Sequence, residues 1–334
     1  MKNRRWVLAD HAEGPLREEL WDLVDDEQRD PGPGEVLVES LWLSVDPYMR
    51  GKLKPSGGMR IGDVMGGPGV GRVVASAHPA WVEGDLIESP SIGWQTAAIV
   101  TPDAPGAGQA SRIAAADPNP QSALSWCGMP GYTAYFAMLH VARPLPGDTV
   151  VISAAGGAVG QIAGQIAAMA GARVVGIAGS DEKLDWCRSI GFHEVLNYKT
   201  VGDLPAEIGR LCPGGVDVFF DATGGAIHDA VIPHLAVRSR VAVVGRVAFT
   251  NSGSAQDVGI RASSRLIDTR ATVQGFTVYD WWHRRPEAAD RLRSWHADGR
   301  LAFREDIASG IESVPAAFLR MMAGESLGKQ LVAL

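Results

Sequence analysis

The segment between residues 149 and 160 holds the residues whose types and spacing most clearly suggest chemistry. β-Branched residues at 149–152 are typical of a buried strand, and a helical stretch follows at 158–170. The turn between them is built from alanine and glycine, so a backbone can approach a diphosphate, and the helix N-terminus offers N–H groups and a positive dipole end. The pattern predicts a dinucleotide-binding turn, with alanine in place of the first glycine of the usual fingerprint. Its expected contact residues are Ala155, Gly157, Ala158, Val159 and Gly160.

The end of the next strand indicates which dinucleotide is bound. NAD sites usually carry an acid there, about 20 residues after the turn, to bind the ribose 2′-hydroxyl. This chain has Gly179 and Ser180 instead, which leaves room for a 2′-phosphate, and Lys183 follows one helical turn later. Asp181 keeps NAD open as an alternative, although an acid in a first helical turn also simply complements the helix dipole. We therefore expect NADPH as the cofactor, with Ser180 as the N-cap of a helix at 180–189.

Strands and helices alternate through this half of the chain. Residues 172–177, 216–220 and 240–244 have the apolar, β-branched character of buried strands, and glycine follows each of them closely. Such alternation predicts a doubly wound parallel sheet of the Rossmann type, with ligands at the carboxyl ends of its strands. The fold class that we expect is α/β.

Length and composition limit the classes of protein that fit. The 334 residues exceed what one core usually spans, so we expect two domains. The net charge of −7 argues against nucleic acid as a partner, and no apolar run approaches the length of a membrane span. Three widely separated cysteines, Cys127, Cys187 and Cys212, favour reduced thiols in the cytoplasm over a disulfide framework.

The first third of the chain has a different texture. Residues 35–45 and 70–75 resemble strands, and 81–88 is predicted to add another across a glycine turn. Short strands between glycine- and proline-rich turns, without helical periodicity, indicate a compact β domain. Helices are expected near the C-terminus at 286–298 and 313–322.

Several motifs follow one another along nearly the whole chain. They are Leu43-Ser44-Val45-Asp46-Pro47-Tyr48-Met49-Arg50, Gly128-Met129-Pro130-Gly131-Tyr132-Thr133-Ala134-Tyr135, residues 153–160, Gly179-Ser180-Asp181-Glu182-Lys183, Asn197-Tyr198-Lys199-Thr200, residues 216–221 and Leu327-Gly328-Lys329. In these motifs the chain resembles the zinc-independent branch of the medium-chain dehydrogenase/reductase superfamily, with its prostaglandin reductases, leukotriene dehydrogenases and alkenal double-bond reductases. The resemblance implies a GroES-like β-rich catalytic domain at 1–124, a Rossmann NADP-binding domain at 125–300 and a C-terminal return to the catalytic domain at 301–334.

The resemblance also implies a reaction, the NADPH-dependent reduction of a carbon–carbon double bond conjugated to a carbonyl. Lys183 and Tyr198 match the family positions that hold the 2′-phosphate. The other positions assigned to the cofactor are Thr133, Gly179, Ser180, Thr223, Gly245, Phe276, Val278 and Ser326.

A catalytic zinc site is not expected. Such a site needs thiolate and imidazole ligands, yet the segment that matches the first ligand region of related alcohol dehydrogenases is Asp46-Pro47-Tyr48. Without a Lewis acid an enone suits the site better than a simple ketone, because hydride added to the β-carbon leaves a charge that the carbonyl oxygen shares. The site then needs a hydrogen-bond donor for that oxygen and a proton for the α-carbon.

The source of that proton is where the chain departs from its family. Many relatives carry a tyrosine in the loop after Gly245 that is proposed to donate the proton, and Thr250 stands there in this chain. Tyr48, in a loop expected to face the nicotinamide, is our first replacement donor, and Tyr279 is the second, although either can instead be a pocket wall. The residues expected to line the substrate pocket are Trp42, Tyr48, Trp94, Phe249, Tyr279 and Trp282, although tryptophans also commonly fill cores.

Two other functions stay open at this point. A quinone oxidoreductase shares the fold and lacks zinc, and a non-catalytic NADPH-binding protein agrees with the missing loop tyrosine. Relatives are commonly dimers that pair strands of their nucleotide domains, and residues 272–278 could supply that edge. We expect a homodimer that acts on a small apolar enone or enal, without a nucleic-acid or membrane partner.

Overall fold

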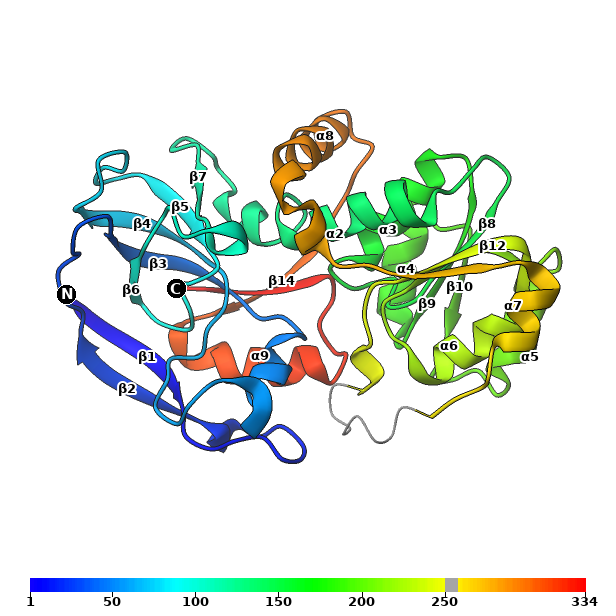
Figure 1. Ribbon diagram of the computed structural model, residues 1–334, viewed down its shortest axis with the longest axis horizontal. Helices are drawn as coiled ribbons and strands as arrows, with labels where there is room; N and C mark the ends of the chain where they lie inside the picture. Colours follow the sequence, from blue (N-terminus) through cyan, green and yellow to red (C-terminus); the bar gives the residue numbers. More distant parts are fainter. Residues whose placement is uncertain (250–257) are drawn as a thin grey trace. The chain divides into compact units, whose positions relative to one another are not determined.

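The chain divides into two compact units in the computed structural model, which describes residues 1–249 and 258–334 (Figure 1). The first unit comprises Met1–Gly128 and Glu305–Leu334, and the second comprises Met129–Arg304. The C-terminal segment belongs to the first unit because strand β15 (Lys329–Ala333) pairs antiparallel with β3 (Val36–Ser44). The α/β fold class predicted from the sequence is confirmed, with one parallel sheet and one largely antiparallel β unit.

The first unit is built on a sheet whose strands come from both ends of the chain. Among the described residues, its seven strands include the path β14-β15-β3-β4-β5-β7, with β6 paired to β3. The first two strands, β1 (Lys2–Leu8) and β2 (Trp21–Glu27), pair antiparallel and form a separate two-stranded hairpin. The remaining elements of the unit are β4 (Gly69–Ser76), β5 (Leu86–Ser89), β6 (Ala97–Val100), β7 (Ser111–Ile113), β14 (Glu305–Ser309), α1 (Met49–Lys52) and α9 (Val314–Met322).

An aromatic cluster forms the centre of the first unit's core. The rings of Trp21, Trp94 and Phe318 lie 5.4 to 5.9 Å apart between centroids. Trp94 and Phe318 have no exposed surface. Edge-to-face and tilted arrangements of this kind are favourable for aromatic rings, so the cluster joins the hairpin, the loop before β6 and helix α9.

The second unit contains the parallel sheet that the sequence predicts. Among the described residues its six strands run in the order β10-β9-β8-β11-β12-β13, all parallel. This is the doubly wound order, in which the chain leaves β8 in one direction and returns on its other side with β11. The strands are β8 (Thr149–Ile152), β9 (Arg173–Ala178), β10 (Glu194–Asn197), β11 (Val216–Asp221), β12 (Leu235–Val243) and β13 (Thr272–Gly275).

Helices cover both faces of this sheet. Figure 1 shows α2 and α3 on one side of the strands and α5 to α7 on the other. Residues 150–152 and 218–220 are therefore completely buried, which explains why these strands are continuous apolar runs rather than alternating ones. The helices are α2 (Met129–Phe136), α3 (Gly160–Met169), α4 (Asp181–Ser189), α5 (Leu204–Leu211), α6 (Gly225–Val231), α7 (Ser263–Thr269) and α8 (Arg285–Ala297).

Most predicted elements are present, and one is wrong in part. Ser180 caps α4 as expected, since its Oγ accepts a hydrogen bond from the Lys183 N–H. The predicted strand at 81–88 begins only at Leu86, because Gly84 turns the chain with φ 93° and the Asp85 carboxylate accepts the N–H of Val82. No helix in residues 1–249 and 258–334 is long and apolar enough to cross a membrane.

Candidate functional site

The turn between β8 and α3 brings backbone N–H groups to the carboxyl end of the sheet. Ala154 adopts a left-handed conformation with φ 49°, which is uncommon for a residue with a side chain. Its carbonyl oxygen accepts the N–H of Gly157, and a Cβ on Gly160 would lie only 2.3 Å from that same oxygen. Residue 160, the first of α3, therefore has to be glycine for this turn to form. The predicted contact residues Ala158 and Val159 lie within this turn, with Val159 as the N-cap of α3.

Ala155 stands at the first fingerprint position without obstructing the turn. Its side chain is completely buried, and its N–H donates to the carbonyl oxygen of Ile177 in β9. The room for this methyl group comes from Gly176, where a Cβ would lie 3.0 Å from that of Ala155. A Cβ on Gly156 would meet the Lys183 side chain at 2.8 Å, so the turn lies directly against α4. The backbone cradle fits a diphosphate, because its glycines remove side chains from the approach.

The end of β9 carries positive charge and a phenol rather than an acid. Gly179 passes so close to β10 that a Cβ there would lie 2.9 Å from Tyr198 and 3.0 Å from Lys199. The ring of Tyr198 is 40% exposed. Asp181, the sequence alternative for an NAD-type acid, instead accepts a hydrogen bond from the Asn197 amide at 2.8 Å. Lys183 lies against the turn after β8, and Tyr198 and Lys199 lie against Gly179. These three residues supply the positive charge and the hydrogen-bond donors that a 2′-phosphate requires.

Asp221 organises the turn at the end of β11, next to β8. Its carboxylate is completely buried and accepts the backbone N–H groups of Thr223 at 3.0 Å and Gly224 at 2.9 Å. Its other oxygen lies 2.8 Å from Nδ1 of His228, in the first turns of α6. Burial alone would raise the pKa of Asp221, but the hydrogen bonds from His228 and from these N–H groups outweigh it and hold the pKa below 3.8. The buried charge thus fixes the backbone where Thr223 was expected to meet the cofactor.

The chain after β12 forms a third segment at this edge of the sheet. The Ala248 N–H donates to the Thr223 carbonyl, and a Cβ on Gly245 would lie 2.8 Å from the carbonyl oxygen of Ala222. The ring of Phe249 approaches the Gly224 backbone. Thr250, which matches the relatives' loop tyrosine, lies outside the described residues.

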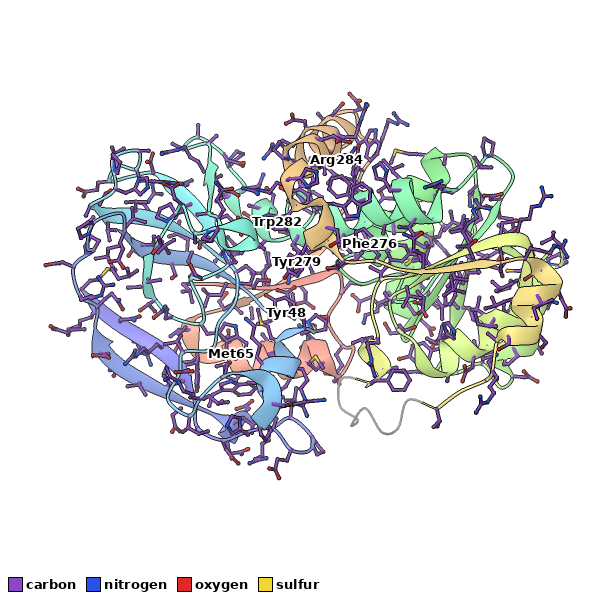
Figure 2. The ribbon with its side chains drawn as sticks, viewed as in Figure 1. Tyr48, Met65, Phe276, Tyr279, Trp282 and Arg284 are labelled. Carbon is purple, nitrogen blue, oxygen red and sulfur yellow. The ribbon has the colours of Figure 1, made fainter. Side chains whose placement is uncertain are left out.

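Residues 276–282 continue from the sheet's last strand. The N–H of Phe276 donates to the carbonyl of Val243, and Val278 is buried. Tyr279 is 54% exposed, and its ring lies 6.0 Å from that of Trp282. Both residues are labelled in Figure 2. The remaining predicted contact on α2, Thr133, donates its hydroxyl to the Met129 carbonyl within the helix.

In the first unit, Tyr48 is the candidate most accessible to a substrate. It precedes α1, and its side chain is 41% exposed. Trp42 in β3 is half-buried against a small core cluster, and Ser326 is buried. Trp94, expected in the substrate pocket, is instead enclosed in the aromatic core, so we leave it out of the proposed pocket.

The segment that matches the first zinc-ligand region of alcohol dehydrogenases contains an ion pair. Asp46 is buried, and one of its oxygens lies 2.8 Å from Nζ of Lys329 in β15. The other oxygen accepts the hydroxyl of Ser44 at 2.5 Å, and Lys329 also donates to the Val45 carbonyl at 2.8 Å. No group of three or more His, Cys, Asp or Glu side chains in the described ranges is arranged to hold a metal ion.

Sequence reasoning missed three residues of these clusters. They are Lys199, His228 and Lys329. Lys199 follows Tyr198 directly in the sequence. A search for cations next to the residues predicted to hold the 2′-phosphate would have found it. The partnership of Lys329 with Asp46 joins residues 283 positions apart, and nothing in either local sequence indicates it.

Two family models match the chain. One describes the N-terminal domain of oxidoreductases and matches residues 4–106, and the other describes zinc-binding dehydrogenases and matches residues 158–294. Prostaglandin reductase 1 of Bos taurus is 38% identical over 333 residues, covering 98% of each chain. The NADPH-dependent curcumin reductase of Escherichia coli is 35% identical over 343 residues, covering 99% of this chain and 96% of that protein.

A solved structure has the same fold over its whole length. The structure of CurA from Vibrio vulnificus in complex with NADPH is 34% identical, with a TM-score of 0.91, and the match covers 99% of this chain and 98% of CurA. The similarity in sequence and the similarity in fold therefore extend over both units of the molecule.

Proposed function

The chain belongs to the zinc-independent branch of the medium-chain dehydrogenase/reductase superfamily, and from that membership we propose that it reduces α,β-unsaturated aldehydes and ketones with NADPH. It is an oxidoreductase of the prostaglandin reductase, curcumin reductase and alkenal reductase type. The bound nicotinamide supplies a hydride to the β-carbon of the substrate. The protein's own tasks are to hold the cofactor, to stabilise the charge that reaches the carbonyl oxygen, and to deliver a proton to the α-carbon.

The second unit's residues support the choice of cofactor. The turn at Ala155, Gly157, Ala158, Val159 and Gly160 presents N–H groups to the diphosphate, and Gly179 and Ser180 leave the space that an acid would fill. Lys183, Lys199 and Tyr198 would hold the 2′-phosphate by charge-assisted hydrogen bonds. In the proposal, Thr133, Thr223, Gly245, Phe276 and Val278 of the second unit contact the rest of the cofactor. Ser326, in the first unit, remains a contact predicted from the sequence alone.

The observation that carries the reaction type is the pairing of Asp46. Its carboxylate already faces Lys329 and the Ser44 hydroxyl, so this segment offers a neutralised acid and no thiolate or imidazole. Such a donor set is a poor match for an electrophilic zinc. Reduction of a conjugated double bond fits it better, because the carbonyl oxygen takes up the charge and needs only hydrogen-bond donors.

The proton donor in this proposal is Tyr48, with Tyr279 as the second candidate. A phenol is a far stronger acid than an aliphatic hydroxyl, and about half of each side chain is exposed, 41% for Tyr48 and 54% for Tyr279. For the apolar contacts of a bulky enone, the proposal keeps the residues predicted from the sequence: Trp42, Phe249 and Trp282. The substrate class is therefore an apolar enone or enal.

The proposal is tested by following NADPH consumption with alkenals, aryl enones, oxidised lipids carrying an enone, and quinones, with NADH in parallel. Turnover of enones with NADPH and much less with NADH is the expected result. Turnover of quinones alone would replace the proposal with a quinone oxidoreductase. Tight NADPH binding without turnover of any compound would indicate a non-catalytic binding protein.

A further inference from the structure

Lys52 faces Tyr48 across one turn of helix α1. The two residues are four positions apart, the spacing that brings side chains together on one helix face. Nζ of Lys52 lies 5.4 Å from the centroid of the Tyr48 ring, within the range of a cation–π contact. Tyr48 is labelled in Figure 2.

The surroundings of Lys52 hold its ammonium in place. Nζ donates to the Gly66 carbonyl at 3.3 Å, and a Cβ on Gly66 would lie only 3.5 Å from Nζ. The side chain is half-buried, and this burial lowers the pKa of Lys52 below 10.5, against the attraction of the Asp46 carboxylate. Loss of hydration strengthens the field that the remaining charge exerts on its neighbours.

The other charged groups around this helix already have partners. Asp46 is paired with Lys329 at 2.8 Å, and its attraction for Lys52 does not outweigh the effect of burial on the Lys52 pKa. Arg50, on the same helix, turns its guanidinium to the carbonyl oxygens of Ala12 and Gly14. Among these groups, Lys52 is the cation whose charge is placed over the Tyr48 ring.

We propose that Lys52 is the positioning and charge partner of Tyr48 in the proton-transfer step, a role that rests on the function proposed above. In that step the O–H bond of Tyr48 breaks and a C–H bond forms at the substrate's α-carbon. The electron pair of the O–H bond stays on the phenolic oxygen, and the ammonium of Lys52 offsets this new negative charge. Solvent then returns a proton to the phenolate, which restores the starting state.

The first test compares a side chain that is always charged with one that never is. In Lys52→Gln, kcat/KM for the best enone at pH 7 should fall about tenfold, the effect of one unit charge near a phenol at this distance. Lys52→Arg should retain most of the activity. The matched control Lys54→Gln removes a lysine two residues away and should leave kcat/KM unchanged.

The pH profile separates a charge effect from a merely structural one. The wild-type kcat/KM should decline as pH rises through the lowered pKa of Lys52, because the ammonium is then lost. Because Tyr48 must be protonated to donate, kcat/KM also declines as its phenol ionises. A permanent guanidinium favours the phenolate, so this limb should lie about one pH unit lower in Lys52→Arg than in Lys52→Gln. An unchanged limb in all three proteins would overturn the proposal.

A second test does not depend on turnover. Tyrosine labelled with ¹³C at Cζ reports ionisation of each phenol by NMR, and Tyr48→Phe identifies the Tyr48 signal. Its titration midpoint should be about one pH unit lower in Lys52→Arg than in Lys52→Gln. If the wild type reduces no enone, the proposed function fails and the titration alone decides the pairing. Equal midpoints in the two variants would then overturn it.

Discussion

Replacing Asp221 tests the buried charge that orders the cofactor side of the parallel sheet. In Asp221→Asn the side chain keeps its shape and one oxygen, so the N–H groups of Thr223 and Gly224 still have an acceptor. The bond to His228 also persists if its ring changes tautomer. The substitution therefore removes the negative charge and little else. Asp221→Ala removes the acceptor as well.

The expected losses follow from the hydrogen bonds that Asp221 accepts. Its three shortest bonds, at 2.8 to 3.0 Å, are charge-assisted and become neutral in Asp221→Asn. A charged bond contributes about 1.5–3 kcal/mol and a neutral one about 0.5–1.5, so each bond loses about 1–1.5 kcal/mol and the three together lose about 3–4 kcal/mol. Asp221→Ala also leaves two N–H groups unsatisfied, each at about 1–3 kcal/mol, and should lose about 5 kcal/mol or more.

Urea unfolding followed by circular dichroism measures these losses at fixed pH. Because the folded-state pKa of Asp221 lies below its unfolded value, its contribution is present above about pH 4 and is lost as pH falls through the folded-state pKa. The stability gap between wild type and Asp221→Asn should thus be fully present at about pH 5, where the Asp221 carboxylate is ionised in the folded protein. It should narrow below pH 4, where the wild-type carboxylate also becomes protonated.

Asp217→Asn is the matched control on the same strand. Asp217 accepts one backbone N–H, from Thr149, so its replacement should cost no more than about 1 kcal/mol. Equal losses for the two asparagine variants, or a gap for Asp221 that widens in acid, would refute the assignment of a stabilising buried charge to Asp221. NADPH affinity should fall in Asp221→Asn and remain unchanged in Asp217→Asn.

Three further predictions concern the cofactor turn and the first unit's ion pair. Lys183→Ala should raise the Kd for NADPH about tenfold or more by calorimetry and leave that for NADH unchanged; an equal change for both would contradict the 2′-phosphate role. Gly160→Ala places a methyl group 2.3 Å from the Ala154 carbonyl oxygen, so it should lower the unfolding free energy by about 1–3 kcal/mol and weaken NADPH binding, whereas unchanged binding would count against the cradle. Lys329→Met should cost about 3–5 kcal/mol in urea unfolding, because Asp46 is left charged and buried, and adding Asp46→Asn should recover much of that loss; additive losses would show that the two residues are not coupled.

The parallel sheet could be predicted because its strands and turns carry local signals. Residues 149–160 combine a buried strand with a glycine turn, and Ser180 sits where a helix cap is needed, so both were found without tertiary information. The strand predicted at 81–88 was wrong in its first half. The turn at Gly84 and the hydrogen bond from the Val82 N–H to the Asp85 carboxylate hold these residues in a turn, and strand pairing begins only at Leu86. Apolar character alone does not distinguish a strand from a packed turn.

Long-range partnerships were the part of the site that the sequence did not indicate. Trp94 has the size and apolar character of a pocket wall, and only its contacts with Trp21 and Phe318 place it in the core. The hydrogen bond of Lys329 to Asp46 depends on β15 returning to β3 at the end of the chain. Lys52 lies four residues from Tyr48, so its contact was open to prediction from helical spacing, but the short helix α1 gave no periodic signal.

The most direct measurement of the proposed reaction traces the transferred hydride. NADPH deuterated at C4 of the nicotinamide, on each face in turn, is supplied with an aryl enone, and the product is analysed by NMR. One of the two labelled cofactors should place deuterium on the β-carbon, while the α-carbon gains its hydrogen from solvent and the carbonyl stays intact. Deuterium on a carbinol carbon, or a product without deuterium from either cofactor, would contradict hydride transfer to the β-carbon.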